Sequence, residues 1–327
     1  MVLLGYQFGF AHGALSERRM KWARRGRIFS PADHRDWARS HAQVPTALVL
    51  DDRVRVFYAD RNEHGKSYPT FVDLDRRDPA RIIYCHKVQI LPFGEPGTFD
   101  DEGVMPSYAL QYEGRTLLYY SGWNRGMTVP YRNSVGLAVS YDGINFQRLY
   151  EGPILERNHL EPYIAVTPTI LREGELWRMW YISGTRWVDV EGRFEPVYVI
   201  KYAYSSDGVN WIRPNHLCVP QMHDEEAFSH PTVIKLGGRY CMWYCYRDSR
   251  NYRDGPGAYR IGYAESPDGL KWTRLDEKNG LPVSSEGWDS TMTCYPFVTQ
   301  CDQRVFMFYN GNGFGQTGFG FAELEVD

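Results

Sequence analysis

The sequence predicts an all-β fold, a five-bladed β-propeller built from four-stranded antiparallel blades. Five times a proline is followed, thirteen residues later, by a tyrosine that ends an apolar, alternating strand: Pro45/Tyr58, Pro106/Tyr119, Pro168/Tyr181, Pro231/Tyr244 and Pro296/Tyr309. Successive prolines lie 61, 62, 63 and 65 residues apart. This spacing exceeds the roughly 40 to 50 residues of common propeller repeats, so the additional residues are expected in loops. Loops from every blade would then surround one central opening.

Each repeat begins with two strands joined by a short polar turn. The turns carry the Gly and Asp residues that are typical of β-hairpins, at 51–52, 113–114, 173–174, 237–238 and 302–303. In three repeats a third strand then leads into Ser-x-Asp-Gly-x-x-aromatic, at 140–146, 205–211 and 266–272. Because Asp-Gly between two alternating runs is a strong hairpin signal, we interpret these aspartates as turn residues rather than as calcium or sugar ligands.

The first and last repeats depart from this pattern. The first has Asp73, Asp75 and the run 76–79 in place of the Asp-Gly turn, and the fifth stops after its third strand at 318–327. Residues 22–29 are well placed to supply the missing fourth strand, which would close the ring by joining the two ends of the chain in one blade. We therefore expect a single propeller domain over 20–327. Residues 1–19 form an N-terminal extension, and the sequence leaves open whether it belongs to the fold.

Composition limits the classes of partner. Hydrophobic residues make up 43% of the chain and aromatic residues 15%, which suits both a β core and a sugar-binding surface. The net charge is -3, and acidic and basic residues are interspersed, so the sequence has no basic cluster of the kind that binds nucleic acid or an anionic membrane. Six cysteines show no metal-binding spacing, and no apolar run reaches the length of a membrane span. We expect a cytoplasmic protein with reduced thiols, no metal and no cofactor, and its oligomeric state stays open.

The repeat phase places two segments of every blade on one face, where the first strand starts and where the second strand ends. The segments before the prolines hold the four candidate catalytic residues, Asp100, Glu161, Glu226 and Asp289. Paired carboxylates suit glycosyl transfer, because one donates a proton to the leaving oxygen while the other activates water or attacks the sugar. The candidate substrate-binding residues on the same face are His41, Gln43, Arg61, Trp123, Asn124, Trp187, His230, Arg247, Tyr295, Asn310 and Asn312.

A structural role is open for several of these residues. Asp100 and Asp289 both follow an aromatic residue at similar phase, so each can instead cap the first strand or bond the backbone of a neighbouring blade. Glu161 and Glu226 lack this repeated context, which favours function. A single His41 or His230 is more often a hydrogen-bonded structural residue.

The chain resembles the five-bladed propeller glycosidase superfamily, which includes glycoside hydrolase families 32, 43 and 130. The likeness covers roughly residues 20–325 and rests on the P-x-V-x(n)-MWY strand pairs and the YAxSxDGxxW turns at 202–211 and 263–272. Segments 41–45, 97–107, 287–290 and 309–315 are similar to a group of relatives associated with bacterial polysaccharide clusters. Families 32 and 43 imply an Asp in blade 1, a second Asp in blade 2 and a Glu acid in blade 3. Asp100 and Glu161 match the last two, but blade 1 offers His41 and Gln43.

These observations favour a glycosidase-like enzyme that acts on a bacterial polysaccharide or oligosaccharide. Glu161 or Glu226 would donate the proton, and Asp100 or Asp289 would be the base or electrostatic partner. One alternative is a non-catalytic carbohydrate-binding propeller in polysaccharide assembly, which the missing blade 1 acid supports. Another is a glycoside phosphorylase or sugar transferase. Resemblance to family 130 would imply phosphorolysis, with a phosphate site at Arg61, Arg247 and His230.

Overall fold

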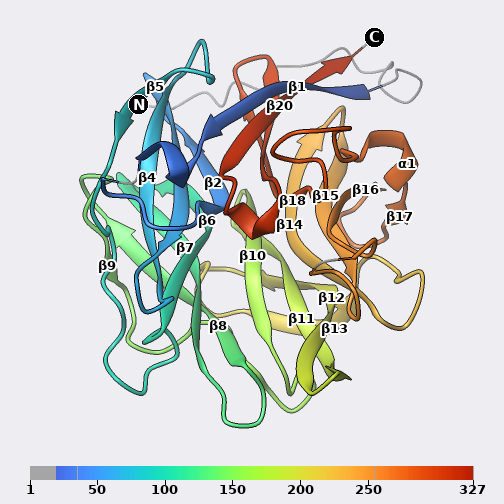
Figure 1. The fold of residues 1–327 in the computed structure, drawn as a ribbon. Helices are drawn as coiled ribbons and strands as arrows, with labels where there is room; N and C mark the ends of the chain where they lie inside the picture. The colour runs from blue at the N-terminus through green and yellow to red at the C-terminus, as the bar shows by residue number, and fades with distance from the viewer. Residues whose placement is uncertain (1–19, 35, 254, 327) are drawn as a thin grey trace.

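The computed structural model describes residues 20–34, 36–253 and 255–326, which fold almost entirely into β-strands (Figure 1). The predicted extension at 1–19 lies outside the described residues. Three short helices complete the secondary structure of the described residues: η1 (Pro31–His34), α1 (Asp276–Asn279) and η2 (Gly313–Gly315). The all-β prediction is therefore confirmed.

The strands form antiparallel units of four. Two of these units share one eight-stranded sheet, joined through the single parallel pair Ser67 and Gly103. They are β2 (Gln43–Val49), β3 (Arg53–Arg61), β4 (Ser67–Asp75) and β5 (Ile82–Cys85), and β6 (Gly103–Tyr112), β7 (Arg115–Arg125), β8 (Tyr131–Ser140) and β9 (Gln147–Arg148). Two separate sheets follow: β10 (Ala165–Glu173), β11 (Leu176–Val190), β12 (Arg193–Ser205) and β13 (Ile212–Leu217), and β14 (Glu226–Leu236), β15 (Arg239–Asp248), β16 (Arg260–Ser266) and β17 (Thr273–Arg274).

The final sheet combines the two ends of the described chain. It consists of β18 (Cys294–Cys301), β19 (Arg304–Asn310), β20 (Phe319–Val326) and β1 (Met20–Phe29). In Figure 1 the blue β1 lies along the red β20, and the pairing is antiparallel from Met20 with Val326 to Phe29 with Phe319. The segment predicted to supply the missing strand thus forms it.

The predicted hairpin turns are present. Glu113 and Gly114 both have positive φ, at 50° and 74°, as the tight turn between β6 and β7 requires. In the turn after β8, Oδ1 of Asp142 accepts hydrogen bonds from the amides of Ile144 and Asn145 at 2.8 Å. A hydrogen bond from the side-chain amide of Asn145, followed by these two backbone bonds, lowers the pKa of Asp142. Asp207 and Asp268 make the same two backbone bonds, so the interpretation of these aspartates as turn residues is confirmed.

The first strand of every unit is irregular at or beside its repeat proline. In four units the pairing with the second strand shifts register across the proline, and the residue before it (Val44, Thr167, His230 or Tyr295) has a left-handed φ between 46° and 53°. In β6 the shift follows Pro106. This conformation is unfavourable for a β-branched residue such as Val44, so it marks a constrained segment. The first strands also contact one another in the cycle β2, β6, β10, β14, β18 and back to β2.

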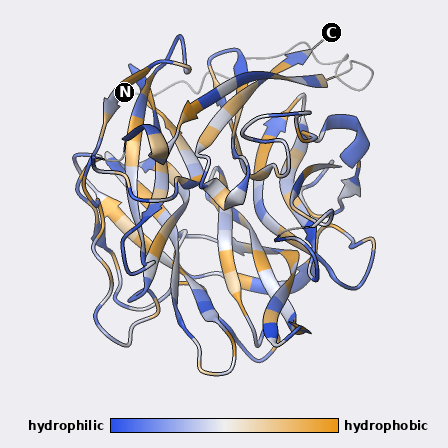
Figure 2. Cartoon of the chain, viewed as in Figure 1, coloured by the Kyte–Doolittle hydropathy of each residue, from blue (hydrophilic) through white to orange (hydrophobic). Residues whose placement is uncertain are grey.

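The core lies between neighbouring units. The five tyrosines of the repeat, at 58, 119, 181, 244 and 309, are completely buried. Figure 2 shows the hydrophobic residues concentrated on the strands, whereas α1 is hydrophilic. Hydrogen bonds also join successive units: the hydroxyl of Tyr119 donates to the carbonyl of Gly208, and Nε1 of Trp180 donates to that of Gly269. Within the described residues, no helix combines the length and apolar character needed to cross a bilayer.

Candidate functional site

The four predicted catalytic acids are buried and each is bound to an arginine of its own unit. None of Asp100, Glu161, Glu226 and Asp289 is more than 3% exposed. The arginines come from the last strand of the unit, β9, β13, β17 or β1. The pairs are Asp100 with Arg148 at 2.7 Å, Glu161 with Arg213 at 3.6 Å, Glu226 with Arg274 at 2.7 Å and Asp289 with Arg24 at 3.2 Å.

Three of these acids also accept a hydrogen bond from a tyrosine that follows exactly twenty positions later. The hydroxyls of Tyr120, Tyr181 and Tyr309 donate to Asp100, Glu161 and Asp289, each at 2.9 Å. For Glu226 the additional donor is the backbone amide of Met222, at 2.7 Å. Three of the acids thereby connect the segment before the first strand to the last strand of the same unit, and Glu226 connects the start of β14 itself to β17.

Each of the four carboxylates has its charged partners within its own unit. Each is held at the last strand of its unit, the edge opposite to the first strands that contact one another, and no two share a partner among the described residues. Each of the four acids therefore forms an ion pair with an arginine of its own unit, and their expected grouping around one opening stays a prediction. A catalytic role for these acids stays a prediction.

Glu161 is the least tightly paired of the four. Its nearest cations are Arg213 at 3.6 Å and Nζ of Lys201 at 3.8 Å, against 2.7 Å for the ion pairs of Asp100 and Glu226. The hydroxyl of Tyr181 contacts both of its carboxylate oxygens, at 2.9 and 3.0 Å. Among the four acids, Glu161 is thus the one whose nearest cation lies farthest away.

Six of the predicted binding residues do form one cluster, beginning with Arg61 at the end of β3. Nε of Arg61 donates to Oε1 of Gln43 at 2.9 Å. Burial lowers the pKa of Arg61, and the charge of Arg253 lowers it further, whereas Tyr295 has the opposite effect. Burial, followed by the charge of Arg61, lowers the pKa of His41 to about 4, so this imidazole is neutral at pH 7.

His230 and Tyr295 continue the cluster from the pre-proline positions of β14 and β18. Their rings lie 6.0 Å apart between centroids. Nδ1 of His230 contacts the carbonyl of Pro296 at 3.1 Å, whereas Nε2 is buried without a hydrogen-bond partner among the described residues. Burial lowers the pKa of His230 to about 4. Because a carbonyl can only accept, the neutral ring carries its proton on Nδ1, and Nε2 is left as a free acceptor.

Arg247 is buried among tyrosines. Its Nε donates to the hydroxyl of Tyr259 at 3.1 Å, its Nη2 donates to the carbonyl of Pro196 at 2.8 Å, and its guanidinium lies 3.7 Å from the ring centroid of Tyr252. Among the residues with described positions, no carboxylate lies within ion-pair distance of Arg247. The rings and carbonyls around it therefore stabilise a buried cation.

The sequence reasoning missed several members of this cluster, chiefly Glu195 and Arg253. Glu195 accepts bonds from Arg253 Nε at 2.8 Å and from the hydroxyl of Tyr252 at 2.6 Å. Burial raises the pKa of Glu195, but these hydrogen bonds and the positive charges outweigh it and leave the pKa below its usual value. Tyr252 and Arg253 lie in the insert between β15 and β16, which the repeat phase places on the predicted face, so the signal was available in the sequence.

The remaining predicted residues have structural contacts. Nε1 of Trp123 donates to Ser67 Oγ at 2.6 Å, Asn124 donates to the carbonyl of Thr98 at 3.3 Å, and Trp187 packs edge-on against Tyr131. The amide of Asn310 bonds the backbone of Val44, Ala42 and Gly318, and that of Asn312 bonds the backbone of Thr291, Met292 and Gly287. Because both side-chain amides form hydrogen bonds with the backbone, we interpret Asn310 and Asn312 as structural residues and do not include them in the proposed binding site.

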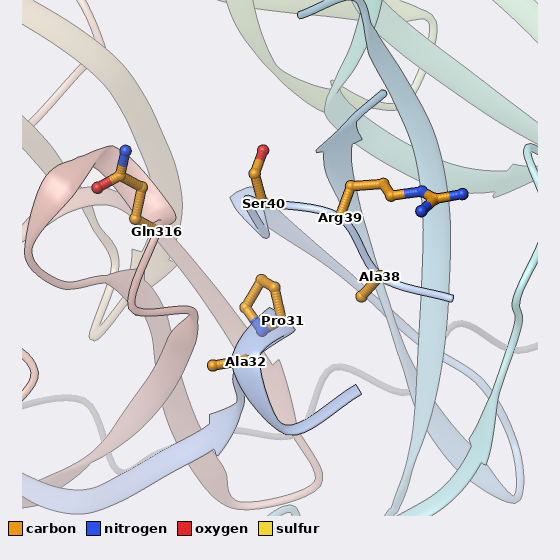
Figure 3. A pocket seen from close by; sticks show the side chains of 6 residues that line it. All are labelled: Pro31, Ala32, Ala38, Arg39, Ser40 and Gln316. Carbon is orange, nitrogen blue, oxygen red and sulfur yellow. The ribbon is translucent and has the colours of Figure 1, made fainter. Parts of the chain in front are cut away.

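A pocket of about 310 Å³ adjoins the His41 side of the cluster. Figure 3 shows Ser40 and Pro31 between Gln316 on one side and Arg39 on the other. Oγ of Ser40 lies 2.7 Å from Nδ1 of His41, which connects the pocket wall to the cluster.

Comparison with known proteins identifies close relatives by sequence. No family model matches the chain. Two Mycobacterium tuberculosis proteins, "Uncharacterized protein MT1551" of strain CDC 1551 / Oshkosh and "Uncharacterized protein Rv1502" of strain H37Rv, are each 36% identical over 308 residues. Each alignment covers 94% of this chain and 100% of the relative.

Solved structures share the fold at lower identity. A "Glycoside hydrolase" has a TM-score of 0.70 at 18% identity, covering 94% of this chain and 92% of its own. A thermostable family-43 glycoside hydrolase has a TM-score of 0.65 at 16% identity, covering 88% and 89%. The Bombyx mori GH32 β-fructofuranosidase BmSUC1 has 0.59 at 15%, covering 90% and 64%. The chain thus has a β-propeller glycosidase-like fold, as its sequence predicted.

Proposed function

The chain belongs to the same family as MT1551 and Rv1502, and from this premise we propose that it is a glycosidase-like protein that binds a bacterial polysaccharide or oligosaccharide. The ligand binds at the cluster of His41, Gln43, Arg61, His230 and Tyr295. The observation that carries this proposal is the free acceptor Nε2 of His230 beside the ring of Tyr295. A sugar offers hydroxyls to such an acceptor and C–H faces to an aromatic ring, so these groups complement it.

We infer that the fold comprises five blades in a single domain over 20–327, with β1 closing the ring. Two observations support this count. The eight-stranded sheet is divided by one residue pair into two runs of four strands, and the five first strands form a closed cycle of contacts. Pairing of β1 with β20 supplies the fourth strand of the last blade.

Binding without turnover is the activity that the geometry supports best. Catalysis by paired carboxylates requires oxygens that can reach the glycosidic bond and its attacking water. The oxygens of Asp100, Glu226 and Asp289 contact arginines at 2.7 to 3.2 Å, so a substrate would have to displace those arginines. The non-catalytic carbohydrate-binding hypothesis is therefore our leading proposal. Cytoplasmic location and the lack of nucleic-acid or membrane partners stay predictions from sequence.

Hydrolysis is the second candidate, and the looser pairing of Glu161 favours it. Incubation of the protein with bacterial polysaccharides, followed by analysis of released sugars, tests this directly. If sugar is released, Glu161→Gln should abolish release while Glu225→Gln, a change at an exposed ion pair, should not. Release that requires inorganic phosphate would identify a phosphorylase, and transfer to an acceptor sugar would identify a transferase.

A glycan-binding screen tests the leading proposal. Tyr295→Asn removes the stacking ring, and Asn tolerates the left-handed φ of 52° at this position. We expect at least a tenfold loss of affinity for any glycan that the protein binds. Tyr141→Asn removes an exposed tyrosine from the turn after β8 and should leave affinity unchanged. Equal affinity of Tyr295→Asn and the parent protein would contradict the proposed site.

A further inference from the structure

Arg61 is a cation with an amide partner instead of a carboxylate. Its Nε donates to Gln43, and among the positions that the structure describes no acidic side chain forms an ion pair with its guanidinium. Asp60, its neighbour in the chain, is unavailable because its carboxylate accepts the backbone amides of residues 39, 40, 41 and 61 and the hydroxyl of Tyr68. The other donor groups of Arg61 are therefore left for a ligand.

A second guanidinium, that of Arg253, is linked to Arg61 through the loop of η2. Arg253 packs over the ring of Phe314, with 5.9 Å between its guanidinium carbon and the ring centroid. The next residue, Gly315, has φ +98°, and a Cβ added there would lie 3.1 Å from Cγ of Gln43. The loop of η2 thus links Arg253 to the Gln43–Arg61 pair, and the charge of Arg253 lowers the pKa of Arg61.

Positive charge exceeds negative charge in this cluster. Glu195 is its one carboxylate with an ion pair to a cluster arginine, and it is engaged by Arg253 and Arg193. The guanidiniums of Arg61 and Arg247 remain without a carboxylate among the described residues. Burial is the main cause that lowers the pKa of His41 to about 4; the charge of Arg61 acts in the same direction, and the charge of Asp60 opposes it.

We propose that Arg61 and Arg253, with Gln43, form an anion-binding subsite that selects a saccharide carrying an acidic group. This inference rests on the proposed carbohydrate-binding function. The anion, a carboxylate or a phosphate ester, accepts hydrogen bonds from the guanidiniums, and a hydroxyl of the same sugar donates to Nε2 of His230 across the ring of Tyr295. Neutral sugars make only the second set of contacts.

Titration calorimetry at low ionic strength with four probes tests the subsite: glucose, glucuronate, glucose 1-phosphate and inorganic phosphate. We expect at least one of the two acidic sugars to bind at least tenfold more tightly than glucose. Arg61→Gln should remove that preference, whereas Arg81→Gln, which removes an exposed arginine at the start of β5, should keep it. A higher salt concentration should lower the affinity for the acidic sugar and leave the affinity for glucose unchanged.

The outcomes separate this inference from the proposed function. Equal affinity for glucose and both acidic sugars overturns the anion subsite and leaves carbohydrate binding in place. Inorganic phosphate that binds as tightly as the acidic sugars also overturns it, because the sugar would then contribute nothing. Loss of every saccharide interaction, in this titration and in the glycan screen, overturns both.

Discussion

At the scale of single residues, a buried carboxylate can have a functional or a structural role, and its hydrogen-bond and ion-pair partners indicate which. Asp289 contacts Tyr309 and Arg24, and Asp100 contacts Tyr120 and Arg148 in the same way. The spacing of twenty residues between acid and tyrosine recurs in three units, and this recurrence was visible in the sequence. A feature repeated in several units stabilises those units, whereas a binding site depends on residues that differ between them.

Substitution of Glu226 tests the structural role of the acids. Glu226→Gln removes the charge that binds Arg274 at 2.7 Å through two nitrogens. Since Arg274 keeps Asp276 as a partner, we expect a loss of about 2 kcal/mol in the free energy of unfolding, measured by urea denaturation. The neighbouring Glu225→Gln, at a more exposed ion pair with Arg250, should cost less than about 1 kcal/mol. Similar losses for both variants would contradict the structural role of Glu226.

Two buried histidines should make stability depend on pH. The folded protein holds the pKa of His41 and of His230 at about 4, below the usual 6.5, so between these values the unfolded chain binds protons that the folded protein does not. Stability should therefore fall as pH falls from 6.5 to 4, by up to about 1.4 kcal/mol per pH unit for each histidine. In urea denaturation at several pH values, His230→Asn should reduce this slope. An unchanged slope would show that the pKa of His230 is the same in the folded and unfolded states, which contradicts the shift caused by burial.

At the scale of strands and turns, local signals were sufficient for prediction where the chain makes its own contacts. The Asp-Gly turns were predictable because Asp142, Asp207 and Asp268 bond amides two and three positions later. The role of β1 was predictable because the fifth repeat lacks one strand. The arginine partners of the acids were not predictable, because the phase of the repeat gives the end of a strand but not which side chains of the last strand lie beside it.

The strand β1 contributes a specific ion pair as well as backbone pairing. Arg24 binds the buried Asp289, so Arg24→Met should lower stability by about 1–3 kcal/mol by leaving that carboxylate with fewer partners. Arg25→Met on the same strand removes only exposed ion pairs with Glu323 and Glu325 and should cost less than about 1 kcal/mol. Thermal unfolding of both variants gives the comparison. Equal melting temperatures would show that Asp289 does not depend on Arg24.

At the scale of the whole molecule, the two ends of the described chain meet in one sheet. Met20 pairs with Val326, so a two-residue Asn-Gly turn could join these positions as a hairpin. A permuted chain that starts at Ser30 and carries residues 20–29 after Val326 should fold with an unchanged circular dichroism spectrum. Deletion of 20–29 should instead abolish cooperative unfolding. A stable, cooperative deletion variant would contradict ring closure by β1.

The binding cluster also belongs to this scale, because its members come from four of the four-stranded units. His41, Gln43 and Arg61 were found from the repeat phase, since the ends of strands can be counted along the sequence. Glu195 and Arg253 were missed, because Arg253 lies in an insert of one repeat only and reaches Glu195 across two sheets. The repeat thus predicted which ends of the strands carry the binding cluster, and the insert between β15 and β16 adds a charged residue that the repeat does not predict.

Hydrogen–deuterium exchange with and without a bound acidic oligosaccharide tests the location of the ligand most directly. We predict slower exchange on binding in the segments 39–44, 60–62, 228–231 and 293–296, which carry His41, Arg61, His230 and Tyr295. Protection confined to the segments around Asp100, Glu161, Glu226 and Asp289 would contradict the proposed location and indicate that the ligand binds at the acids.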